Sequence, residues 1–245
     1  MVAGSTPAEG TGTLKICVNE RKIKLTSRRD FLKLLGAGAL AATGLAGVRE
    51  VLANPSQTHK VYMPLVKAPT KNVVWTIGDS IVHGYGGMGE DIRTWMIYNN
   101  WKLKFIGTQV SLSQHHDGHD GYTTVDILNN LPTWAQQIIE YPRNIFVHAG
   151  TADLEKGTTP NLQGIVDFLK YHYPYAYVHV ARIIQNYPSN SKVTNYNHNY
   201  VDRLHDAHII DMENLLTQYY DYFDKLHPNA SGYQKMGTKI LQNLR

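Results

Sequence analysis

Cysteine is almost absent from this sequence: among 245 residues, only Cys17 carries a thiol. One cysteine cannot close a disulfide within the chain, so packing and hydrogen bonds must hold the fold. Cys17 also precedes the segment that we interpret below as a removable export signal. We therefore expect a mature chain with no disulfide, no thiol nucleophile and no lipidated cysteine.

A hydrophobic run of membrane-spanning length is missing as well. The apolar run Leu34–Val48 has about fifteen residues, whereas a spanning helix needs about 20. It has no polar face, which argues against an amphipathic helix of the mature fold. It follows Arg28, Arg29 and Lys33, and small side chains lie near a cleavage point that we place after Ala53, within about three residues. These features are typical of an export signal.

The paired arginines ahead of that run resemble those of a twin-arginine signal. The resemblance implies that residues 1–53 are an export signal with an extended N-region, and that the twin-arginine export machinery carries the protein already folded. We therefore predict a secreted or periplasmic protein without a stable membrane anchor.

An excess of positive charge is also missing once the signal is set aside. The whole chain is formally +4, but residues 1–53 hold eight of its 24 Lys and Arg and four of its 20 Asp and Glu. Residues 54–245 therefore carry sixteen charges of each sign. The basic balance comes from the signal, so it gives no reason to expect nucleic acid as a partner.

Beyond the signal, residues 54–71 contain three prolines and mixed polar residues, and we interpret them as a linker or arm. Residues 72–245 alternate between strand-like and helix-like segments, which predicts one domain with a parallel sheet and helices on both faces. The expected strands are Val73–Ile77, Leu103–Thr108, Ile145–His148, Tyr177–Ile184 and His208–Asp211.

Apolar residues recur at helical spacing between these strands. One helix is expected to begin with Thr159 as its N-cap and Pro160 as its first residue. Pro228 is expected to open the final helix. The apolar positions that predict the helices are Ile92, Trp95, Met96, Leu162, Ile165, Val166, Leu169, Ala230, Tyr233, Met236, Gly237, Ile240, Leu241 and Leu244.

Two further features allow more than one interpretation. The stretch QHHDGHDG, residues 114–121, offers five potential metal ligands. No second ligand cluster lies at a matched spacing, so we expect a solvated flexible loop and no metal site. The sixteen tyrosines, as in KYHYPYAY and QYYDYF, are either ordinary packing residues or a platform on which sugars stack.

A candidate nucleophile follows the first expected strand, in the sequence Gly78-Asp79-Ser80. A serine at a strand-to-helix turn is exposed to substrate, but its hydroxyl needs a neighbouring base before it becomes reactive. Taken alone, the tripeptide also fits an ordinary turn in which Ser80 caps the next helix.

The far end of the chain favours chemistry at Ser80. There Asp224 precedes His227 by three residues, so both side chains reach the same side of one turn. Asp224 can then hold one imidazole nitrogen and leave the other to face Ser80, which is the arrangement of a catalytic triad.

Together these segments resemble the SGNH hydrolases, also called the GDSL family, over about residues 72–244. Gly78-Asp79-Ser80 is similar to the first family block, HDGHDGYTTVDIL to the second, and Asp224 with His227 to the last. The resemblance implies a flavodoxin-like three-layer α/β/α sandwich around about five parallel strands. It also implies Ser80 as nucleophile, an oxyanion hole from the backbone N–H groups of Ser80 and Gly121, a bracing role for Asp79, and neither metal nor cofactor.

Within that family, the second block and LHPNASGYQKM are most similar to the branch that contains carbohydrate esterase family three. That branch deacetylates xylan-type polysaccharides. Asp120 and Tyr122 replace the serine and the tryptophan of the branch's second block. The resemblance therefore implies acetyl esters of carbohydrate as the substrate class.

One position departs from the family pattern. The third block of the family is Gly-x-Asn-Asp, and residues 150–153 of this chain are Gly-Thr-Ala-Asp. The family asparagine donates a side-chain N–H group to the oxyanion, and Ala152 has no donor to give. Loss of one oxyanion donor typically lowers the rate by about 10²–10³, so the resemblance implies a slow esterase.

Three functions are compatible with these residues. The first is an exported serine esterase that removes small acyl groups, above all acetyl groups, from small molecules or polysaccharide. The second, favoured by Ala152 and the many tyrosines, is a carbohydrate-binding or scaffold protein of the same fold that has lost catalysis. The third is a lysophospholipase or thioesterase of the same superfamily, which requires a long apolar groove that no loop of the sequence predicts.

Overall fold

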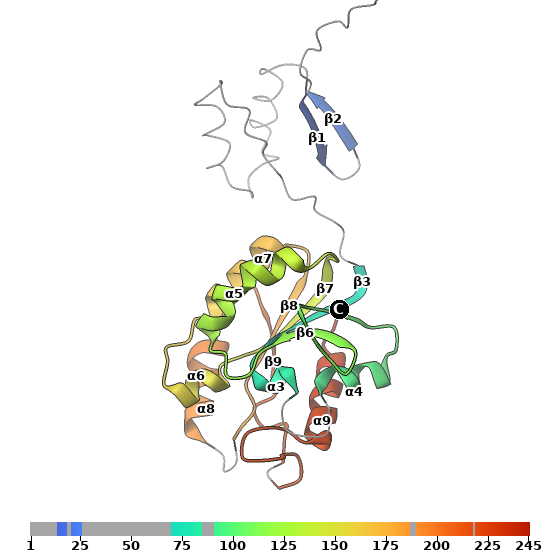
Figure 1. Ribbon diagram of the computed structural model, residues 1–245. Coiled ribbons are helices and arrows are strands. Elements are labelled where there is room, and N and C mark those ends of the chain that lie inside the picture. Colours follow the sequence, from blue (N-terminus) through green and yellow to red (C-terminus); the bar gives the residue numbers. More distant parts are fainter. Residues whose placement is uncertain (1–13, 19–20, 26–69, 85–90, 187–189, 218) are drawn as a thin grey trace, which may run out of the picture. The chain divides into compact units, whose positions relative to one another are not determined.

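The computed structural model describes residues 14–18, 21–25, 70–84, 91–186, 190–217 and 219–245 (Figure 1). The expected export signal, its cleavage site after Ala53 and most of the arm at 54–71 therefore lie outside the described residues. Among the described residues, no helix is long and apolar enough to cross a membrane. The chain divides into two units, Met1–Leu65 and Val66–Arg245, which we describe separately.

In the first unit, β1 (Leu14–Val18) and β2 (Arg21–Leu25) pair as antiparallel strands, with Leu14 opposite Leu25 and Val18 opposite Arg21. This hairpin was not expected from the sequence. A partial signal was present, because basic and apolar residues alternate from Lys22 to Leu25, which is the period of a β-strand.

A seven-stranded sheet forms the centre of the second unit. Six of its strands run parallel, since β6-β3-β7-β8-β9 are neighbours in this order and β4 also pairs with β3, which confirms the predicted parallel sheet. β4 pairs with β3 ahead of β6, and β5 lies antiparallel to β6. The strands are β3 (Thr70–Gly78), β4 (Lys104–Ile106), β5 (Gln109–Ser111), β6 (Gln114–Gly118), β7 (Pro142–His148), β8 (Tyr177–Ala181) and β9 (His208–Ile210).

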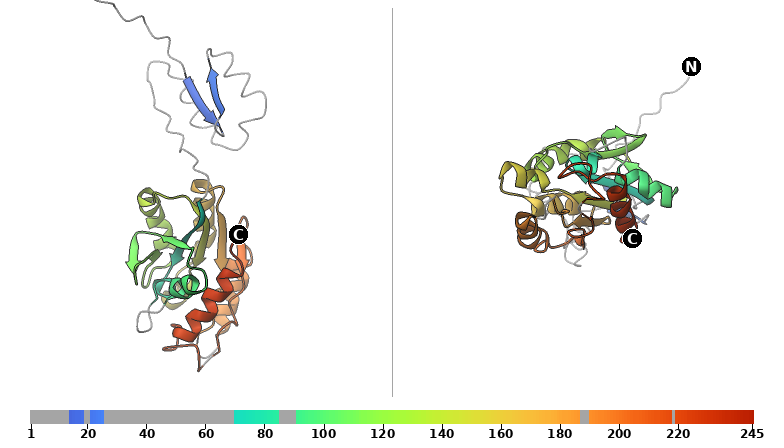
Figure 2. Two further views of the ribbon diagram at one scale, coloured as in Figure 1. Left: turned by 90° about the vertical axis from the view of Figure 1, so that its right-hand side faces the viewer. Right: turned by 90° about the horizontal axis from the view of Figure 1, so that it is seen from below.

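Helices cover both faces of the sheet, as the alternation of the sequence predicted. The side chains of β3 alternate between the two cores: Val73 and Trp75 pack with α5, α7 and α8, and Val74 packs with α4 and α9. Figures 1 and 2 show these two helical layers with the sheet between them. The helices are α3 (Ser80–His83), α4 (Ile92–Asn99), α5 (Thr124–Gln137), α6 (Thr151–Lys156), α7 (Leu162–His172), α8 (Ser191–Tyr196), the π-helical turn η1 (Asn197–Val201) and α9 (Ala230–Leu241).

The predicted starts of two helices are wrong. The N-cap of α7 is Asn161 instead of Thr159, and its side chain accepts a hydrogen bond from Gly164 N at 3.1 Å. The N-cap of α9 is Asn229, and Pro228 instead pairs with Tyr222 in an isolated bridge. In both cases the side-chain oxygen of an asparagine accepts a hydrogen bond from an N–H group in the first turn of the helix. A proline has no side-chain oxygen that could accept this bond.

The boundaries of three predicted strands also differ. The segment expected as one strand over Leu103–Thr108 divides into β4 and the start of the β5–β6 hairpin. The last strand-like residues of Tyr177–Ile184 follow β8, which ends at Ala181. β3 begins at Thr70, within the segment expected as an arm.

The stretch QHHDGHDG was expected as a flexible solvated loop, and that expectation is wrong. Residues 114–118 form β6, and His116 and Asp117 are buried. The Asp117 carboxylate accepts hydrogen bonds from Trp75 Nε1 at 2.6 Å and from Thr108 N at 3.1 Å. These bonds replace the water that the polar side chain loses, which allows a polar sequence to form an inner strand. Within the described residues, no group of three or more potential metal ligands occurs.

Three buried histidines determine how stability should depend on pH. Burial lowers the pKa of His116 to about 3 and the pKa values of His148 and His179 to about 4, whereas an unfolded histidine has a pKa of about 6.5. Between about pH 6.5 and pH 4, the unfolded chain therefore binds protons that the folded protein does not, so acidification favours unfolding. Asp79 opposes this effect, because burial raises its pKa to about 6.

We expect the free energy of unfolding to fall by an amount on the order of 5 kcal/mol between pH 6.5 and pH 4, since three histidines outweigh one carboxyl group at about 1.4 kcal/mol per pKa unit. Urea denaturation followed by tryptophan fluorescence at both pH values measures the change. Equal free energies of unfolding at the two pH values would contradict it.

Candidate active site

The candidate residues meet at the carboxyl ends of the parallel strands, where α/β proteins place their sites. Ser80 begins α3 directly after β3, and Gly121 lies in the turn after β6. Ala152 lies in the first turn of α6, after β7. Asp224 and His227 lie in the loop between β9 and α9. Residues from four separate segments thus converge on one end of the sheet.

A tight turn places Ser80. A side chain at Gly78 would collide with the His148 carbonyl oxygen, which is 2.1 Å from the position of a Cβ atom there, so the strand end requires glycine. Asp79 is the N-cap of α3, and its Oδ1 accepts a hydrogen bond from Ile81 N at 3.1 Å. Asp79 therefore holds the backbone of the turn from a buried position.

The hydroxyl of Ser80 lies beside an imidazole. Ser80 Oγ is 3.0 Å from His227 Nε2, and His227 Nδ1 is 2.8 Å from Asp224 Oδ2. Partial burial acts to raise the pKa of Asp224, but hydrogen bonds from the N–H groups of His227 and Leu226 and from the imidazole lower it below the usual value.

These contacts assign the protons of the imidazole. An ionised Asp224 only accepts hydrogen bonds, so the Nδ1 atom of neutral His227 carries the proton and Nε2 is an acceptor. Its lone pair accepts the hydrogen bond of the Ser80 hydroxyl. The arrangement can remove a proton from Ser80 when its oxygen attacks an electrophile.

The loop that carries Asp224 and His227 is tied to α9. Asp221 is fully buried, and its carboxylate accepts hydrogen bonds from Lys235 Nζ at 2.6 Å and from Ser231 Oγ at 2.7 Å. Within the loop, Phe223 N donates to the His227 carbonyl oxygen at 2.8 Å. The spacing of Asp224 and His227 is therefore held by bonds that the sequence pattern alone does not reveal.

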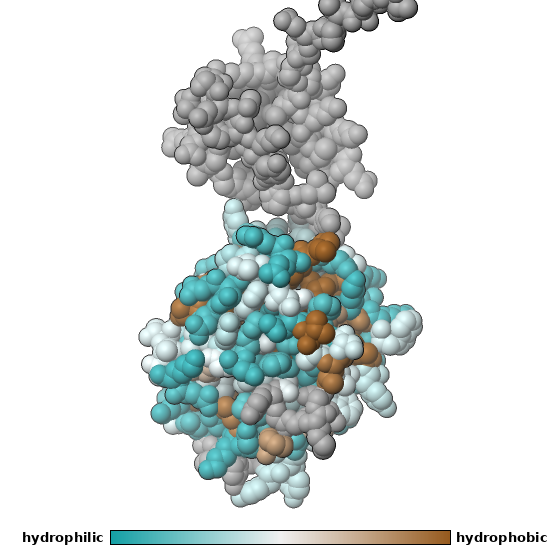
Figure 3. Space-filling view, in the orientation of Figure 1, coloured by the Kyte–Doolittle hydropathy of each residue, from teal (hydrophilic) through white to brown (hydrophobic). Residues whose placement is uncertain are grey.

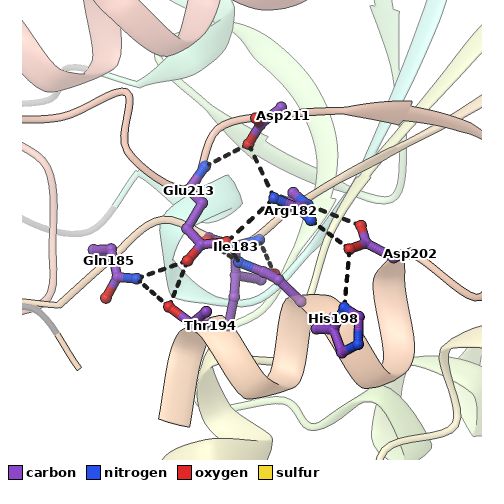
Figure 4. Close-up of polar contacts among 9 residues, drawn as sticks. Arg182, Ile183, Gln185, Thr194, His198, Asp202, Asp211 and Glu213 are labelled. Atoms are coloured by element: carbon purple, nitrogen blue, oxygen red, sulfur yellow. Dashed lines mark hydrogen bonds and ion pairs between the residues drawn. The ribbon is translucent and has the colours of Figure 1, made fainter. Parts of the chain in front are cut away.

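A polar network centred on the buried Glu213 joins the start of the same loop to the segment after β8 and to α8 (Figure 4). Glu213 accepts hydrogen bonds from Gln185 Nε2 at 3.0 Å and from Thr194 Oγ1 at 2.6 Å, and Arg182 lies between Glu213 and further carboxylates. The hydroxyl of Tyr222 donates to the Gln185 carbonyl oxygen. No sequence signal identified this network, because its members follow two different strands and meet only in the folded chain.

Gly121 lies in a tight turn with a free donor. Its φ of +71° is in the left-handed region that favours glycine. The turn is closed by Tyr122 N, which donates to the His119 carbonyl oxygen at 3.2 Å, and His119 N donates to the Gly78 carbonyl oxygen at 3.0 Å. Among the described residues, no acceptor binds the N–H group of Gly121 or of Ser80. Both groups are therefore available to an oxyanion.

Ala152 is buried, with 3% of its surface exposed, and it adds no donor at this end of the sheet. The carboxylate of the neighbouring Asp153 bonds to other parts of the fold. It accepts hydrogen bonds from Thr124 N at 2.8 Å and from Thr158 Oγ1 at 3.0 Å. Asp153 thereby joins the start of α6 to the start of α5 and serves the fold of the site.

Tyr196 occupies the space next to the third block. Its hydroxyl donates to the Ala149 carbonyl oxygen at 3.0 Å. A Cβ atom at Gly150 would lie 2.1 Å from the Tyr196 ring, and Gly150 also has a φ of +126°, so only glycine fits there. Because its proton is already donated to Ala149, the Tyr196 hydroxyl does not replace the missing amide donor.

The profile of the GDSL-like Lipase/Acylhydrolase family matches residues 76–235, which is well over half of the chain. No significant match was found among curated protein sequences.

Among solved structures, the Clostridium thermocellum family 3 carbohydrate esterase has a TM-score of 0.58 at 23% identity, over 69% of this chain and 93% of that chain. The carbohydrate esterase family 3 from Talaromyces cellulolyticus has a TM-score of 0.51 at 20% identity, over 70% and 95%. The lipase/acylhydrolase from Enterococcus faecalis has a TM-score of 0.53 at 17% identity, over 70% and 94%. These similarities establish the fold, a mostly parallel sheet flanked by helices.

Proposed function

The chain belongs to the GDSL-like Lipase/Acylhydrolase family, and from this premise we propose that it is a serine esterase that hydrolyses small acyl esters. The observation that carries the proposal is the contact between Ser80 Oγ and His227 Nε2 at 3.0 Å, with Asp224 on the other side of the imidazole at 2.8 Å. No metal or organic cofactor is part of the proposed reaction.

In the first half of the proposed reaction, Ser80 Oγ attacks the carbonyl carbon of the ester while His227 Nε2 takes the hydroxyl proton. The negative charge moves to the carbonyl oxygen, which the N–H groups of Ser80 and Gly121 stabilise. The C–O bond to the alcohol then breaks, and His227 gives its proton to the departing oxygen. The acyl group remains on Ser80.

In the second half, His227 takes a proton from water, and the water oxygen attacks the acyl carbon. Collapse of this intermediate releases the carboxylic acid and returns the proton to Ser80. Asp224 orients the imidazole and stabilises its charged form in both halves. Because Ala152 supplies no third donor, we propose a turnover slower than that of a site with an asparagine there.

For the alcohol part of the substrate, we propose an acetylated polysaccharide. Tyr219, Tyr220 and Phe223 lie on the loop that carries Asp224 and His227, and their exposed fractions are 80%, 76% and 65%. Exposed aromatic rings present flat apolar faces with little loss of side-chain freedom, which suits a sugar ring. On the face drawn in Figure 3, the described apolar residues form small separate patches instead of the long groove that an acyl chain requires.

The test uses residues 54–245 with p-nitrophenyl acetate, acetylated xylan and a lysophospholipid. We expect acetate release from the first two, no release of fatty acid, and no turnover by Ser80→Ala. Tyr220→Ser combined with Phe223→Ser should lower kcat/KM for xylan about thirtyfold, at roughly 1 kcal/mol per ring, and leave p-nitrophenyl acetate unchanged. Tyr171→Ser, an equally exposed tyrosine on α7, is the matched control.

Two outcomes would reject parts of this proposal. If wild-type activity on p-nitrophenyl acetate equals that of Ser80→Ala, the protein is not a serine esterase. If the lysophospholipid is hydrolysed and xylan is not, the substrate class is lipid.

A second candidate function is glycan binding without catalysis, and Ala152 is the observation that favours it. It predicts binding to xylan and no reaction of Ser80 with a fluorophosphonate. Rapid labelling of Ser80, detected by mass spectrometry, would reject it.

We also propose that the protein acts outside the cytoplasm after twin-arginine export. The sequence at Arg28 and Arg29 and the apolar run that follows support this. N-terminal sequencing of protein recovered from the periplasm or medium should begin within about three residues of Asn54. Retention of the intact N-terminus in the cytoplasm would contradict export.

A further inference from the structure

The two backbone donors proposed for the oxyanion lie on different elements. Ser80 N belongs to α3, whereas Gly121 N belongs to the turn between β6 and α5. Ala152, in the third block, adds no side-chain amide to these two N–H groups. A misplacement of about 1 Å at a reacting centre can lower a rate about 10²-fold, so whatever fixes Gly121 relative to Ser80 matters for catalysis.

One side of the Gly121 turn is held by the helix of the nucleophile. His83 is the last residue of α3, three residues after Ser80, and its Nδ1 lies 2.7 Å from Asp120 Oδ1. The carbonyl group of Asp120 and the N–H group of Gly121 belong to the same peptide unit. The contact therefore connects the peptide that carries one donor to the helix that carries the other.

His83 is itself held by Arg93 and His116. The guanidinium of Arg93, fully buried, donates to the His83 carbonyl oxygen at 3.0 Å and to the Val82 carbonyl oxygen at 2.5 Å. Arg93 is in turn paired with Asp91 at 2.6 Å. The His83 ring also stacks on the ring of His116, with centroids 5.3 Å apart and planes at 27°. These contacts fix the position of the end of α3 independently of its contact with Asp120.

The other side of the turn is held by α6. Lys156 lies four residues after Ala152, on the same face of the helix. Its Nζ donates a hydrogen bond to the Gly121 carbonyl oxygen at 2.6 Å. A side chain of α6 therefore bonds the peptide unit that follows Gly121, and a side chain of α3 bonds the side chain of the residue that precedes it.

We propose that His83, Asp120 and Lys156 form a clamp that positions the Gly121 N–H group as an oxyanion donor. This inference rests on the proposed esterase function. Half-exposed ion pairs contribute little to stability, typically about 0–1 kcal/mol, and the side chains of His83 and Asp120 are 40% and 50% exposed. Stability alone therefore gives little reason for the His83–Asp120 contact and the Lys156 hydrogen bond to lie on one four-residue turn. Their shared effect is on the orientation of Gly121.

The kinetic test compares Asp120→Ala and Lys156→Met with Lys104→Met. Lys104 pairs with Glu140 at the opposite, amino-terminal end of the strands, so it is a matched exposed lysine away from the site. We expect each clamp variant to lower kcat for p-nitrophenyl acetate about tenfold with KM within about twofold, because only donor geometry changes. Asp120→Asn and Lys156→Arg keep the hydrogen bonds and should retain most of the activity, and the control should match wild type.

A second measurement does not depend on turnover. The Tyr122 amide closes the turn, so its hydrogen exchange, followed by NMR, reports how often the turn opens. We expect this exchange to accelerate about tenfold in Asp120→Ala and Lys156→Met and to stay unchanged in Lys104→Met.

The two measurements separate failure of the clamp from failure of the proposed function. If wild type hydrolyses no ester, the proposed function fails, and faster Tyr122 exchange in the variants still supports the clamp. If wild type is active and both variants keep kcat within about twofold of wild type, the clamp is overturned. Unchanged Tyr122 exchange in both variants also overturns it.

Discussion

Replacing His227 by alanine should lower kcat for p-nitrophenyl acetate by about 10⁵-fold, because removal of the base from a serine triad costs on the order of 10⁶ in a fast enzyme and this site starts slower. Without the imidazole 3.0 Å from its oxygen, the Ser80 hydroxyl keeps its proton and is a poor nucleophile. The residual rate should be the rate that the two backbone donors and substrate binding support.

Asp224→Asn should lower kcat by about 10⁴-fold for a different reason. An amide nitrogen in place of Oδ2 donates to His227 Nδ1, which must then be the unprotonated nitrogen. The proton moves to Nε2, and Nε2 is no longer able to accept the proton of Ser80.

Kinetic assays of the two purified variants with p-nitrophenyl acetate measure both losses of kcat. Circular dichroism shows that each variant is folded. His205→Ala is the matched control, because His205 is exposed and pairs with its neighbour Asp206 instead of with Ser80. A loss of less than about tenfold in His227→Ala would mean that a different base serves the reaction, since a positioned general base alone contributes about 10²–10⁴.

Ala152→Asn should raise kcat by about 10²-fold, the effect of one restored oxyanion donor at the lower end of the usual range. The residue lies in the first turn of α6 beside the ends of β3 and β7. An amide there adds an N–H group to those of Ser80 and Gly121. The ground-state ester gains little from the new donor, so KM should change much less than kcat.

Two variants at the same position control for shape and charge. Ala152→Asp has the shape of asparagine without the N–H group, and its negative charge should lower kcat below the wild-type value. Ala152→Leu adds similar bulk without a polar group and should give no gain. Overpacking of this buried position is expected to cost about 1–3 kcal/mol, which thermal denaturation measures for all three variants.

A gain in Ala152→Asn alone would establish that the site is built for a donor that the natural chain lacks. Equal kcat values in wild type and a folded Ala152→Asn would contradict this view and would assign the slow rate to another cause. An increase in all three variants would show that bulk, not hydrogen bonding, limits the reaction.

Much of the fold was determined by short-range patterns in the sequence. Alternation of strand-like and helix-like segments predicted a parallel sheet covered on both faces, and the structure has this arrangement. The placement of Ser80 after a buried strand, and of Asp224 three residues before His227, was equally visible. These features depend on neighbouring residues, whose geometry is set by backbone period and turn chemistry.

The tertiary structure alone decided the contacts between distant residues. Ser80 and His227 are 147 positions apart, and their approach depends on how the sheet, α9 and the loop between β9 and α9 pack. The sequence did not predict β6 for a related reason. Its His116 and Asp117 are polar, and only hydrogen-bond partners from other segments offset the energetic cost of burying them.

The surroundings of Gly121 also separate into residues that the sequence predicted and residues that only the tertiary structure brings together. The family resemblance implied Gly121 as a donor and Ala152 as the position that lacks one. His83 and Lys156 were not identified, because neither belongs to a motif and each meets the turn from a different helix. Local sequence determines which groups the chain carries and which elements they sit on. The angle and distance between elements, set by core packing across the whole sheet, determine which of those groups can act together.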